Sequence, residues 1–188
     1  AVYTQNLVCG APVTVTKQNL ADGKARAVVC NSGIANTCNA DGVEKARGMC
    51  EITAKALGIA PTDVIVASTG VIGQPLDLSP VEQGMPQLIG ELSKAGSDHA
   101  AQAIMTTDTR KKEFALTFML GGKGCTIGAI SKGSGMIHPN MATMLCFITT
   151  DVAISTPMLQ KALSAAVADS FNMLSIDGDT STNDMACI

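Results

Sequence analysis

Short apolar runs that stop at loops rich in glycine and hydroxyl residues recur along this chain. Residues 25–33 (ARAVVCNSG), 63–73 (DVIVASTGVIG) and 144–154 (MLCFITTDVAI) are rich in β-branched and small apolar residues, which favour buried strands. Because loops at strand ends often carry functional groups, these loops are the first place to look for chemistry.

Two other segments have strand patterns. Residues 11–18 (APVTVTKQ) alternate between apolar and polar side chains, so we expect a strand there. Residues 112–120 and 123–131 predict a strand pair joined across Gly121 and Gly122.

Helical patterns lie between these strands. A helix is expected from about Asp41 until Gly58, a residue type that commonly ends helices. Its buried face is predicted to contain Val43, Ala46, Cys50, Ala54 and Leu57. A short helix is expected near residues 98–105 and another after Thr156-Pro157. The inward face of the latter is predicted to contain Leu159, Leu163, Ala166 and Val167.

Residues 79–96 predict a further helix. Ser79 and Glu82 have the spacing of a capping box, with Pro80 at the first helical position. Pro86 is expected to kink this helix or to shift its start. The predicted buried stripe is Val81, Met85, Leu88 and Leu92. Strands in blocks with helices packed outside them predict a layered α+β architecture.

Composition narrows the functional classes. The 188 residues fit one domain or one and a half. The core must consist of Val, Ile, Leu, Met and Ala because only 3% of residues are aromatic. No apolar run approaches the roughly 18 residues of a membrane span, so no membrane partner is expected. A net charge of −3 with few aromatic rings offers neither a basic stripe nor stacking platforms, so no nucleic-acid partner is expected.

Seven cysteines occur without any C-x-x-C spacing. We interpret them as small buried hydrophobes of a protein in a reducing compartment, in preference to a metal site or a redox pair. His99 and His138 form no ligand motif, so no metal is expected. The strand-like start (AVYTQNLV) and the apolar end (NDMACI) both indicate a segment of a longer protein.

Three loops allow two interpretations each. The STG loop of Ser68, Thr69 and Gly70 is either an oxyanion hole or a plain turn. The TTDTR loop, residues 106–110, is either a substrate-binding loop or a turn in which Asp108 bonds to nearby backbone. The GGKGCTIG stretch invites comparison with a phosphate loop, but its residue order differs from that motif and predicts a hairpin turn.

The segment KGSGMIHPNMATML, residues 132–145, holds the most reactive candidates. Lys132 could bind a carboxylate, and His138 is interpreted as a loop residue that shapes the segment. Thr143 is either a strand residue or a nucleophile. If the Ala142–Thr143 peptide bond is cut, the new α-amine of Thr143, with a pKa near 7.7–8.0, can accept the proton of its own hydroxyl.

Five motifs together resemble the ornithine acetyltransferase family, also called glutamate N-acetyltransferases. KGSGMIHPNMATML, followed by a strand ending in TTD, resembles the self-cleavage motif of that family. The other resembling motifs, in family order and covering nearly the whole chain, are VVCNSGIANTCNADG, ASTGVIG, IMTTDT and SIDGDTSTND.

The resemblance implies an enzyme of arginine biosynthesis that cuts itself between Ala142 and Thr143. Thr143 would take an acetyl group from N-acetylornithine and pass it to glutamate in a ping-pong cycle, without a metal or organic cofactor. Acetyl-CoA serves some members as an additional donor. Thr69 and Gly70 would form the oxyanion hole, while Thr106 and Lys132 would contact substrate.

The implied fold is the α-β-β-α sandwich of self-cleaving aminopeptidases and ornithine acetyltransferases. Residues 1–188 would form one incomplete catalytic domain. Residues 1–142 would end the first subunit and residues 143–188 would begin the second. The two pieces are expected to associate as a heterodimer and in higher oligomers, in the cytoplasm or, in a eukaryote, the mitochondrion.

Two alternatives remain open. A self-cleaving aminopeptidase of the same architecture would resolve the acyl-enzyme with water instead of an amino acid. A non-catalytic glycine-loop protein that binds an anion or nucleotide would keep an unbroken chain.

Overall fold

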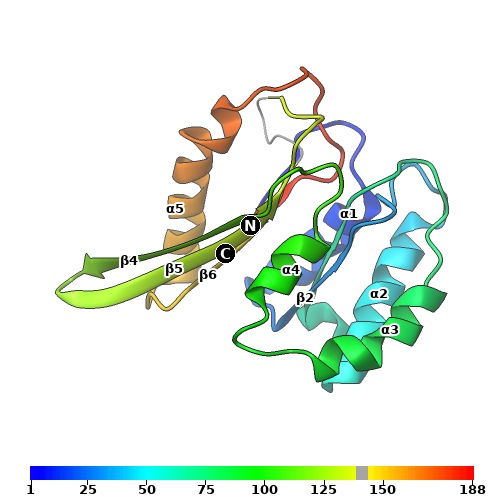
Figure 1. The fold of residues 1–188 in the computed structure, drawn as a ribbon, viewed down its shortest axis with the longest axis horizontal. Coiled ribbons are helices and arrows are strands. Elements are labelled where there is room, and N and C mark those ends of the chain that lie inside the picture. Colours follow the sequence, from blue (N-terminus) through cyan, green and yellow to red (C-terminus); the bar gives the residue numbers. More distant parts are fainter. Residues whose placement is uncertain (139–143) are drawn as a thin grey trace. The chain divides into compact units, whose positions relative to one another are not determined.

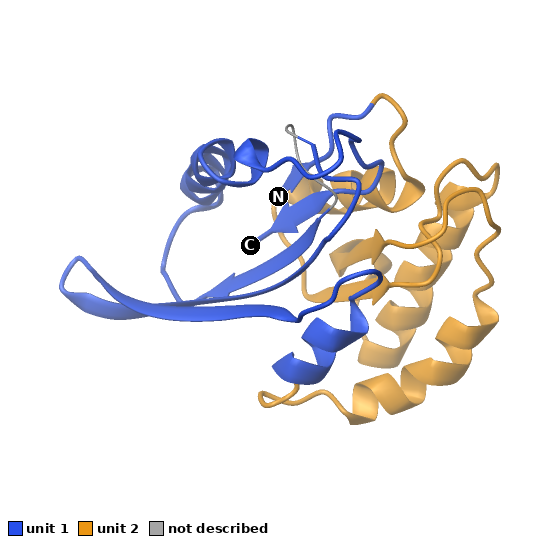
Figure 2. Cartoon of the chain, turned by 45° about the horizontal axis from the view of Figure 1, so that its top comes forward, with its two compact units in different colours: residues 1–6, 97–188 blue, residues 7–96 orange. Residues whose placement is uncertain are grey.

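The computed structural model describes residues 1–138 and 144–188 of the chain. These residues divide into two compact units, coloured separately in Figure 2. Unit 1 contains residues 1–6 and 97–188, and unit 2 contains residues 7–96. Both helices and sheets are present, so the predicted α+β class is confirmed.

Unit 2 is built on two short parallel strands. β2 (Ala27–Asn31) pairs with β3 (Val64–Ser68), in a register that runs from Ala27 opposite Val64 to Asn31 opposite Ser68. Helices α1 (Ala11–Asn19), α2 (Gly42–Leu57) and α3 (Ser79–Gly90) accompany them (Figure 1). Single 3-10 turns occupy Leu20–Asp22 and Pro61–Asp63. The core consists of Val15, Ala46, Met49, Cys50, Ala54, Val64, Val66 and Leu76.

The expected strand at residues 11–18 is wrong, because these residues form α1. Pro12 lies in the first turn of the helix, where its missing N–H costs nothing. Val13 and Val15 are both buried, at 0% and 1% exposure, so the alternation of apolar residues does not mark a half-exposed strand. Tertiary burial outweighs the strand preference of these β-branched residues.

Thr16 links α1 to the outer edge of β3. Its hydroxyl donates to the Val66 carbonyl at 2.7 Å and accepts the Val66 N–H at 2.9 Å. β3 has a strand neighbour only on its β2 side, among the described residues. The threonine therefore satisfies backbone groups that would otherwise be unpaired in the core.

The helix expected from about Asp41 is confirmed as α2, and Gly58 ends it in a left-handed conformation. The helix at residues 79–96 is confirmed in part. The capping box is wrong: the Asp77 carboxylate accepts both the hydroxyl and the N–H of Ser79, and the N-cap residue is Leu78, which makes no side-chain cap. Met85 alone is buried in α3, whereas Leu88 and Leu92 are 57% and 67% exposed.

Unit 1 is built on a five-stranded sheet in the order β1-β7-β6-β5-β4. Its strands are β1 (Val2–Tyr3), β4 (Lys112–Leu120), β5 (Lys123–Lys132), β6 (Leu145–Thr150) and β7 (Met185–Cys187). β6 pairs antiparallel with β5 and parallel with β7. Helix α4 (Ser97–Ala103) precedes the sheet's hairpin, and α5 (Thr156–Ala168) is followed by a 3-10 turn at Phe171–Met173.

Leu163 and Val167 anchor α5 on the sheet, where they pack with Met144, Cys146 and Ala186. The predicted inward face of this helix is thus confirmed at two positions. Ala166 is exposed and Leu159 is half-buried.

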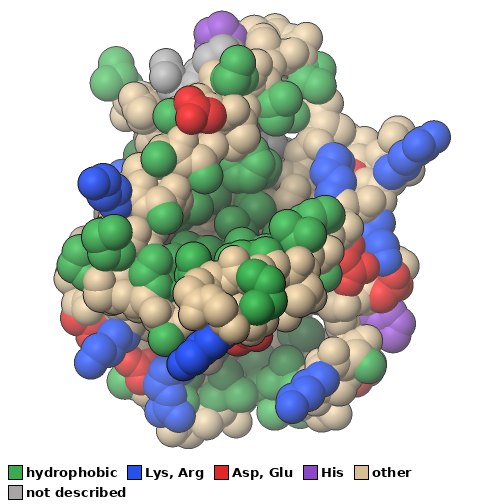
Figure 3. All heavy atoms as spheres, turned by 90° about the vertical axis from the view of Figure 1, so that its left-hand side faces the viewer, with side chains coloured by type: hydrophobic (Ala, Val, Ile, Leu, Met, Phe, Trp, Pro, Cys, Tyr) green, Lys and Arg blue, Asp and Glu red, His purple; other side chains and the backbone are tan. Residues whose placement is uncertain are grey.

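The predicted hairpin of β4 and β5 is confirmed, with Gly121 and Gly122 at its turn. Both glycines have positive φ, at 57° and 78°, as a two-residue hairpin turn of this hand requires. The hairpin is apolar and exposed, and Figure 3 views the molecule from the side at which it ends. Its exposed apolar side chains include Phe114, Leu116, Met119 and Leu120. Within the two described ranges, no helix has the length and apolarity needed to cross a membrane.

We predict that Thr16→Val destabilises the protein by about 1–3 kcal/mol, because it leaves the Val66 N–H and carbonyl without a partner in the core. Thr14→Val is the matched control, since Thr14 lies in the same helix and is only half-buried. Urea denaturation of the two variants measures the difference. Equal free energies of unfolding would contradict the role of Thr16.

Candidate functional site

The STG loop in unit 2 continues the pairing of β2 and β3 beyond the ends of both strands. Thr69 N donates to Asn31 O at 2.9 Å, and Val71 N donates to Gly33 O at 3.1 Å. The Asn31 side chain braces the facing loop, since its Oδ1 accepts the Gly33 N–H at 2.9 Å. The two loops therefore form one rigid structure at the carboxyl end of the strand pair.

Gly70 lies where no other residue fits. Its φ is +123°, and a Cβ atom built there would lie 2.2 Å from the Gly33 carbonyl oxygen. Gly70 is exposed while Thr69 is buried, at 6% exposure. The backbone at Gly70 is thus accessible and held in one conformation, which is what an oxyanion hole requires of a backbone donor.

In unit 1, the structure brings Thr106 and Lys132 together. Lys132 Nζ donates to Thr106 Oγ1 at 2.7 Å. Lys132 is only 3% exposed although it carries a charge, whereas Thr106 is exposed. Burying an ammonium group is costly unless other groups compensate for its lost hydration. The two residues predicted to contact substrate therefore form one polar pair at the end of β5.

Asp108 organises the loop that carries Thr106. Its carboxylate accepts the Gly133 N–H at 2.8 Å and the Thr106 N–H at 3.3 Å, and it binds Lys112 Nζ at 2.5 Å. Burial acts to raise the pKa of Asp108, but these three hydrogen bonds outweigh it and lower the pKa below its ordinary value. The turn interpretation of the TTDTR loop is thus confirmed for Asp108.

Asp184 is a buried acid that the motif comparison left without a role. It lies just before β7 and is 1% exposed. Its Oδ1 accepts the Met144 N–H at 2.9 Å, and its Oδ2 has no hydrogen-bond partner among the described residues. Burial raises the pKa of Asp184 to about 7, although the Met144 N–H, the Ser181 side chain and the positive charge of Lys132 oppose the shift. In the sequence it is the last residue of the motif SIDGDTSTND and lies directly before the apolar run MACI.

The remaining candidates divide between the described and undescribed parts of the chain. Ala142 and Thr143 lie outside the described residues, so the cleavage site and nucleophile stay predictions. His138 is exposed. Thr69 and Gly70 belong to unit 2, whereas Thr106, Lys132 and Asp184 belong to unit 1.

The cysteines are free, and four of them are buried. Burial raises the pKa of Cys50 and Cys146 to about 11 and that of Cys187 to about 12, so these thiols stay protonated near neutral pH. Across residues 1–138 and 144–188, no three His, Cys, Asp or Glu residues are grouped as a metal site would need.

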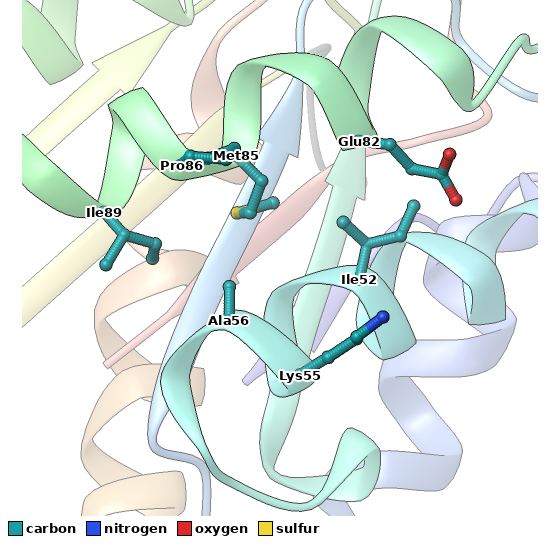
Figure 4. A pocket seen from close by; sticks show the side chains of 7 residues that line it. All are labelled: Ile52, Lys55, Ala56, Glu82, Met85, Pro86 and Ile89. Atoms are coloured by element: carbon teal, nitrogen blue, oxygen red, sulfur yellow. The ribbon is translucent and has the colours of Figure 1, made fainter.

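A separate hollow of about 630 Å³ lies between α2 and α3 in unit 2. Figure 4 shows its lining residues, which come from these two helices, with Met85 directed between them. The lining consists of Ile52, Lys55, Ala56, Glu82, Met85, Pro86 and Ile89. Of the predicted active-site residues that the structure describes, none lines this hollow.

Several solved structures resemble this chain, and two of them come from Bacillus halodurans and Mycobacterium tuberculosis. Arginine biosynthesis bifunctional protein ArgJ of Bacillus halodurans superposes with a TM-score of 0.68 at 38% identity, over 77% of this chain and 75% of that one. Ornithine acetyltransferase of Mycobacterium tuberculosis, solved in complex with ornithine, has a TM-score of 0.66 at 32% identity, over 77% and 76% of the two chains. The fold is therefore of the ornithine acetyltransferase type, as expected.

Sequence comparison identifies the family of this chain within that class of fold. The ArgJ family profile matches residues 1–188. ArgJ of Symbiobacterium thermophilum is 52% identical over 188 residues, which are 100% of this chain and 47% of that protein. ArgJ 1 of Clostridium acetobutylicum is 52% identical over 187 residues, or 99% and 46%. The chain belongs to the ArgJ family and spans about half the length of these curated relatives.

We predict that Gly70→Ala costs at least about 3 kcal/mol of stability, because the strain of positive φ adds to a backbone clash. Gly73→Ala is the matched control: Gly73 also has positive φ, at +79°, but nothing lies within 4 Å of the Cβ position. It should cost only about 1–2 kcal/mol. Thermal denaturation of both variants checks this, and equal losses would contradict the close approach.

Asp184 predicts a pH dependence of stability. Its pKa in the folded state, about 7, is above its ordinary value of 3.8, so the folded chain binds this proton more tightly. The stabilisation is complete below about pH 4 and is lost as the pH rises towards about 7. The free energy of unfolding of the wild type should therefore fall relative to that of Asp184→Asn across this window. Asp169→Asn, at an exposed position, should follow the wild type, and a constant wild-type–Asp184→Asn difference would contradict the shift.

Proposed function

We propose that the protein carrying this chain is a glutamate N-acetyltransferase, or ornithine acetyltransferase, that cuts itself before Thr143 and uses this threonine as its nucleophile. The hydrogen bond between the buried Lys132 and the exposed Thr106 carries the proposal. In the sheet, Lys132 pairs with Leu145, two residues after Thr143. A cation for the substrate carboxylate thus lies opposite the residue that comes two positions after the proposed nucleophile. The ornithine in the related Mycobacterium tuberculosis structure supports an amino-acid substrate.

Self-cleavage would proceed by attack of the Thr143 hydroxyl oxygen on the Ala142 carbonyl carbon. The C–N bond breaks, the nitrogen takes the hydroxyl proton, and an ester joins the two pieces. Water then hydrolyses the ester, which leaves a carboxylate on Ala142 and a free hydroxyl and amine on Thr143. The amine can then serve as the base for that hydroxyl.

Acetyl transfer would follow in two half-reactions. Thr143 attacks the acetyl carbonyl of N-acetylornithine, its amine takes the hydroxyl proton, and ornithine leaves with a proton on its amine. The amine of glutamate then attacks the acetyl-threonine ester, and N-acetylglutamate leaves. The Gly70 N–H and the Thr69 hydroxyl are the proposed donors to the oxyanion, where one donor contributes about 10²–10³ in rate. The cycle as proposed needs no metal or organic cofactor.

The sheet of unit 1 supports a stable association of the cleaved pieces. β5 would belong to the first piece and β6 to the second. They pair over six positions, from Lys132 opposite Leu145 to Ile127 opposite Thr150. β1 and β7 pair across the same division. These backbone hydrogen bonds do not depend on the Ala142–Thr143 bond, so we propose that the product is a heterodimer. Its proposed location is the cytoplasm or, in a eukaryote, the mitochondrion.

Cleavage and acetyl exchange test this proposal on the natural-length protein. Mass spectrometry with N-terminal sequencing should find two pieces, one beginning Thr-Met-Leu-Cys, and Thr143→Ala should stay uncut. Wild type should exchange labelled ornithine into N-acetylornithine. An uncut wild-type chain would contradict the proposal, and peptide hydrolysis without exchange would indicate an aminopeptidase. Replacing N-acetylornithine by acetyl-CoA reveals whether there is a second donor.

Lys132→Met tests the substrate site in protein that has already been cut. The kcat/KM of the cut protein for N-acetylornithine should fall at least about thirtyfold, because a buried partner of the carboxylate is lost. Lys123→Met, at the exposed hairpin turn, is the control and should behave as wild type. Unchanged kinetics of Lys132→Met would contradict carboxylate binding by Lys132.

A further inference from the structure

Residues 176–185 contact both ends of the segment 139–143, which contains the proposed cleavage site. On the upstream side, the Asp177 carboxylate accepts the Met136 N–H at 2.6 Å and the Ile137 N–H at 2.8 Å. Ile176 N also donates to the Ile137 carbonyl at 2.7 Å. The chain is therefore held by three hydrogen bonds directly before His138.

On the downstream side, the contact is made by Asp184 and the residue after it. Asp184 Oδ1 accepts the Met144 N–H at 2.9 Å, and Met185 N donates to the Met144 carbonyl at 2.9 Å. The Met144 nitrogen is the one bonded to the Thr143 carbonyl carbon. Asp184 thus holds the first peptide group that follows the proposed nucleophile.

The carboxylates of Asp177 and Asp184 differ in ionisation and in hydrogen bonding. Hydrogen bonds from the Met136 and Ile137 backbone lower the pKa of Asp177, so it stays ionised near neutral pH. Asp184 is buried, and its Oδ2 has no partner within the described chain. A buried carboxyl oxygen without a partner is costly and needs an explanation.

Several titratable or charged groups lie on the strands around Asp184. Burial lowers the pKa of the Ala1 α-amine, directly before β1, below its ordinary value. Lys132, on β5, contributes a positive charge. Tyr3, on β1, and Cys187, on β7, have pKa values raised by burial to about 12. Cys146, on β6, has a pKa of about 11 for the same reason. The phenol of Tyr3 and both thiols remain neutral while Asp184 changes its charge.

We propose that Asp177 and Asp184 are positioning residues for the self-cleavage, which hold the two ends of the segment that contains the Ala142–Thr143 bond, and that Asp184 does so best when ionised. The inference rests on the proposed self-cleavage. An ionised carboxylate accepts a shorter, stronger hydrogen bond than a neutral acid. It therefore limits the movement of the Thr143–Met144 peptide group while the threonine hydroxyl attacks the preceding carbonyl.

The test follows cleavage of the natural-length precursor, made by cell-free translation and then shifted to buffers from about pH 5.5 to about pH 8.5. Wild-type cleavage should accelerate as the pH rises through about 7. Asp184→Asn keeps an acceptor oxygen but no charge, so it should cleave about tenfold more slowly at high pH and lose the acceleration. Asp184→Glu, which restores the charge, should restore the pH profile.

Asp177→Asn tests the hydrogen bonds on the upstream side of the segment while Asp184 is still able to titrate. It loses one of the two acceptor oxygens, so cleavage should slow while the rise with pH persists. Asp169→Asn, at an exposed position with no part in these contacts, should match the wild type. A Thr143→Ala background, in which no variant is cut, allows the folding of each variant to be compared by thermal denaturation.

The outcomes are distinct. Wild-type cleavage that does not change with pH, or Asp184→Asn that matches the wild type, would overturn the inference about Asp184. Should Asp184→Asn not fold, the wild-type pH profile and Asp177→Asn still decide it. A wild-type precursor that is never cut, at any pH, would refute the proposed function instead.

Discussion

The pairing of β6 with strands on both of its sides is the constraint on which the candidate site depends. On one side, β5 places Lys132 opposite Leu145. On the other, β7 runs parallel, with Met185 opposite Leu145, so that Asp184 meets the Met144 N–H. Backbone hydrogen bonds therefore determine where a buried cation and a buried acid lie relative to the start of β6. A shift of this register by one residue would turn both side chains to the other face of the sheet.

Lys132 and Asp184 carry opposite charges near the start of β6, and their attraction offsets part of the cost of burying each of them. Lys132 is 3% exposed and Asp184 is 1% exposed, so each loses most of its hydration. The positive charge of Lys132 lowers the pKa of Asp184, but burial dominates and leaves it near 7. If these two positions served stability alone, apolar residues at both of them would often give a more stable protein. The retained charges are consistent with the proposed amino-acid substrate.

Local sequence patterns correctly predicted those elements whose conformation depends on their own residues and not on distant contacts. The Gly121-Gly122 turn between β4 and β5 is one example, because positive φ at both positions nearly requires glycine. Gly58 at the end of α2 is another. The prediction failed for α1, where Val13 and Val15 are buried and Thr16 bonds to Val66, fifty residues away. It also failed for the capping box, because Ser79 found a nearer acceptor in Asp77.

The sequence alone identified the family through the order of five motifs, and it indicated the loops that carry Thr69, Gly70, Thr106 and Lys132. Covalent order and residue type suffice for this, since a motif keeps its spacing whatever surrounds it. Only the tertiary structure decided that Lys132 meets Thr106, that Gly70 touches Gly33, and that Asp177 and Asp184 hold either end of the segment 139–143. These contacts join residues 26 to 41 positions apart, and burial and sheet register, which no local pattern encodes, bring them together.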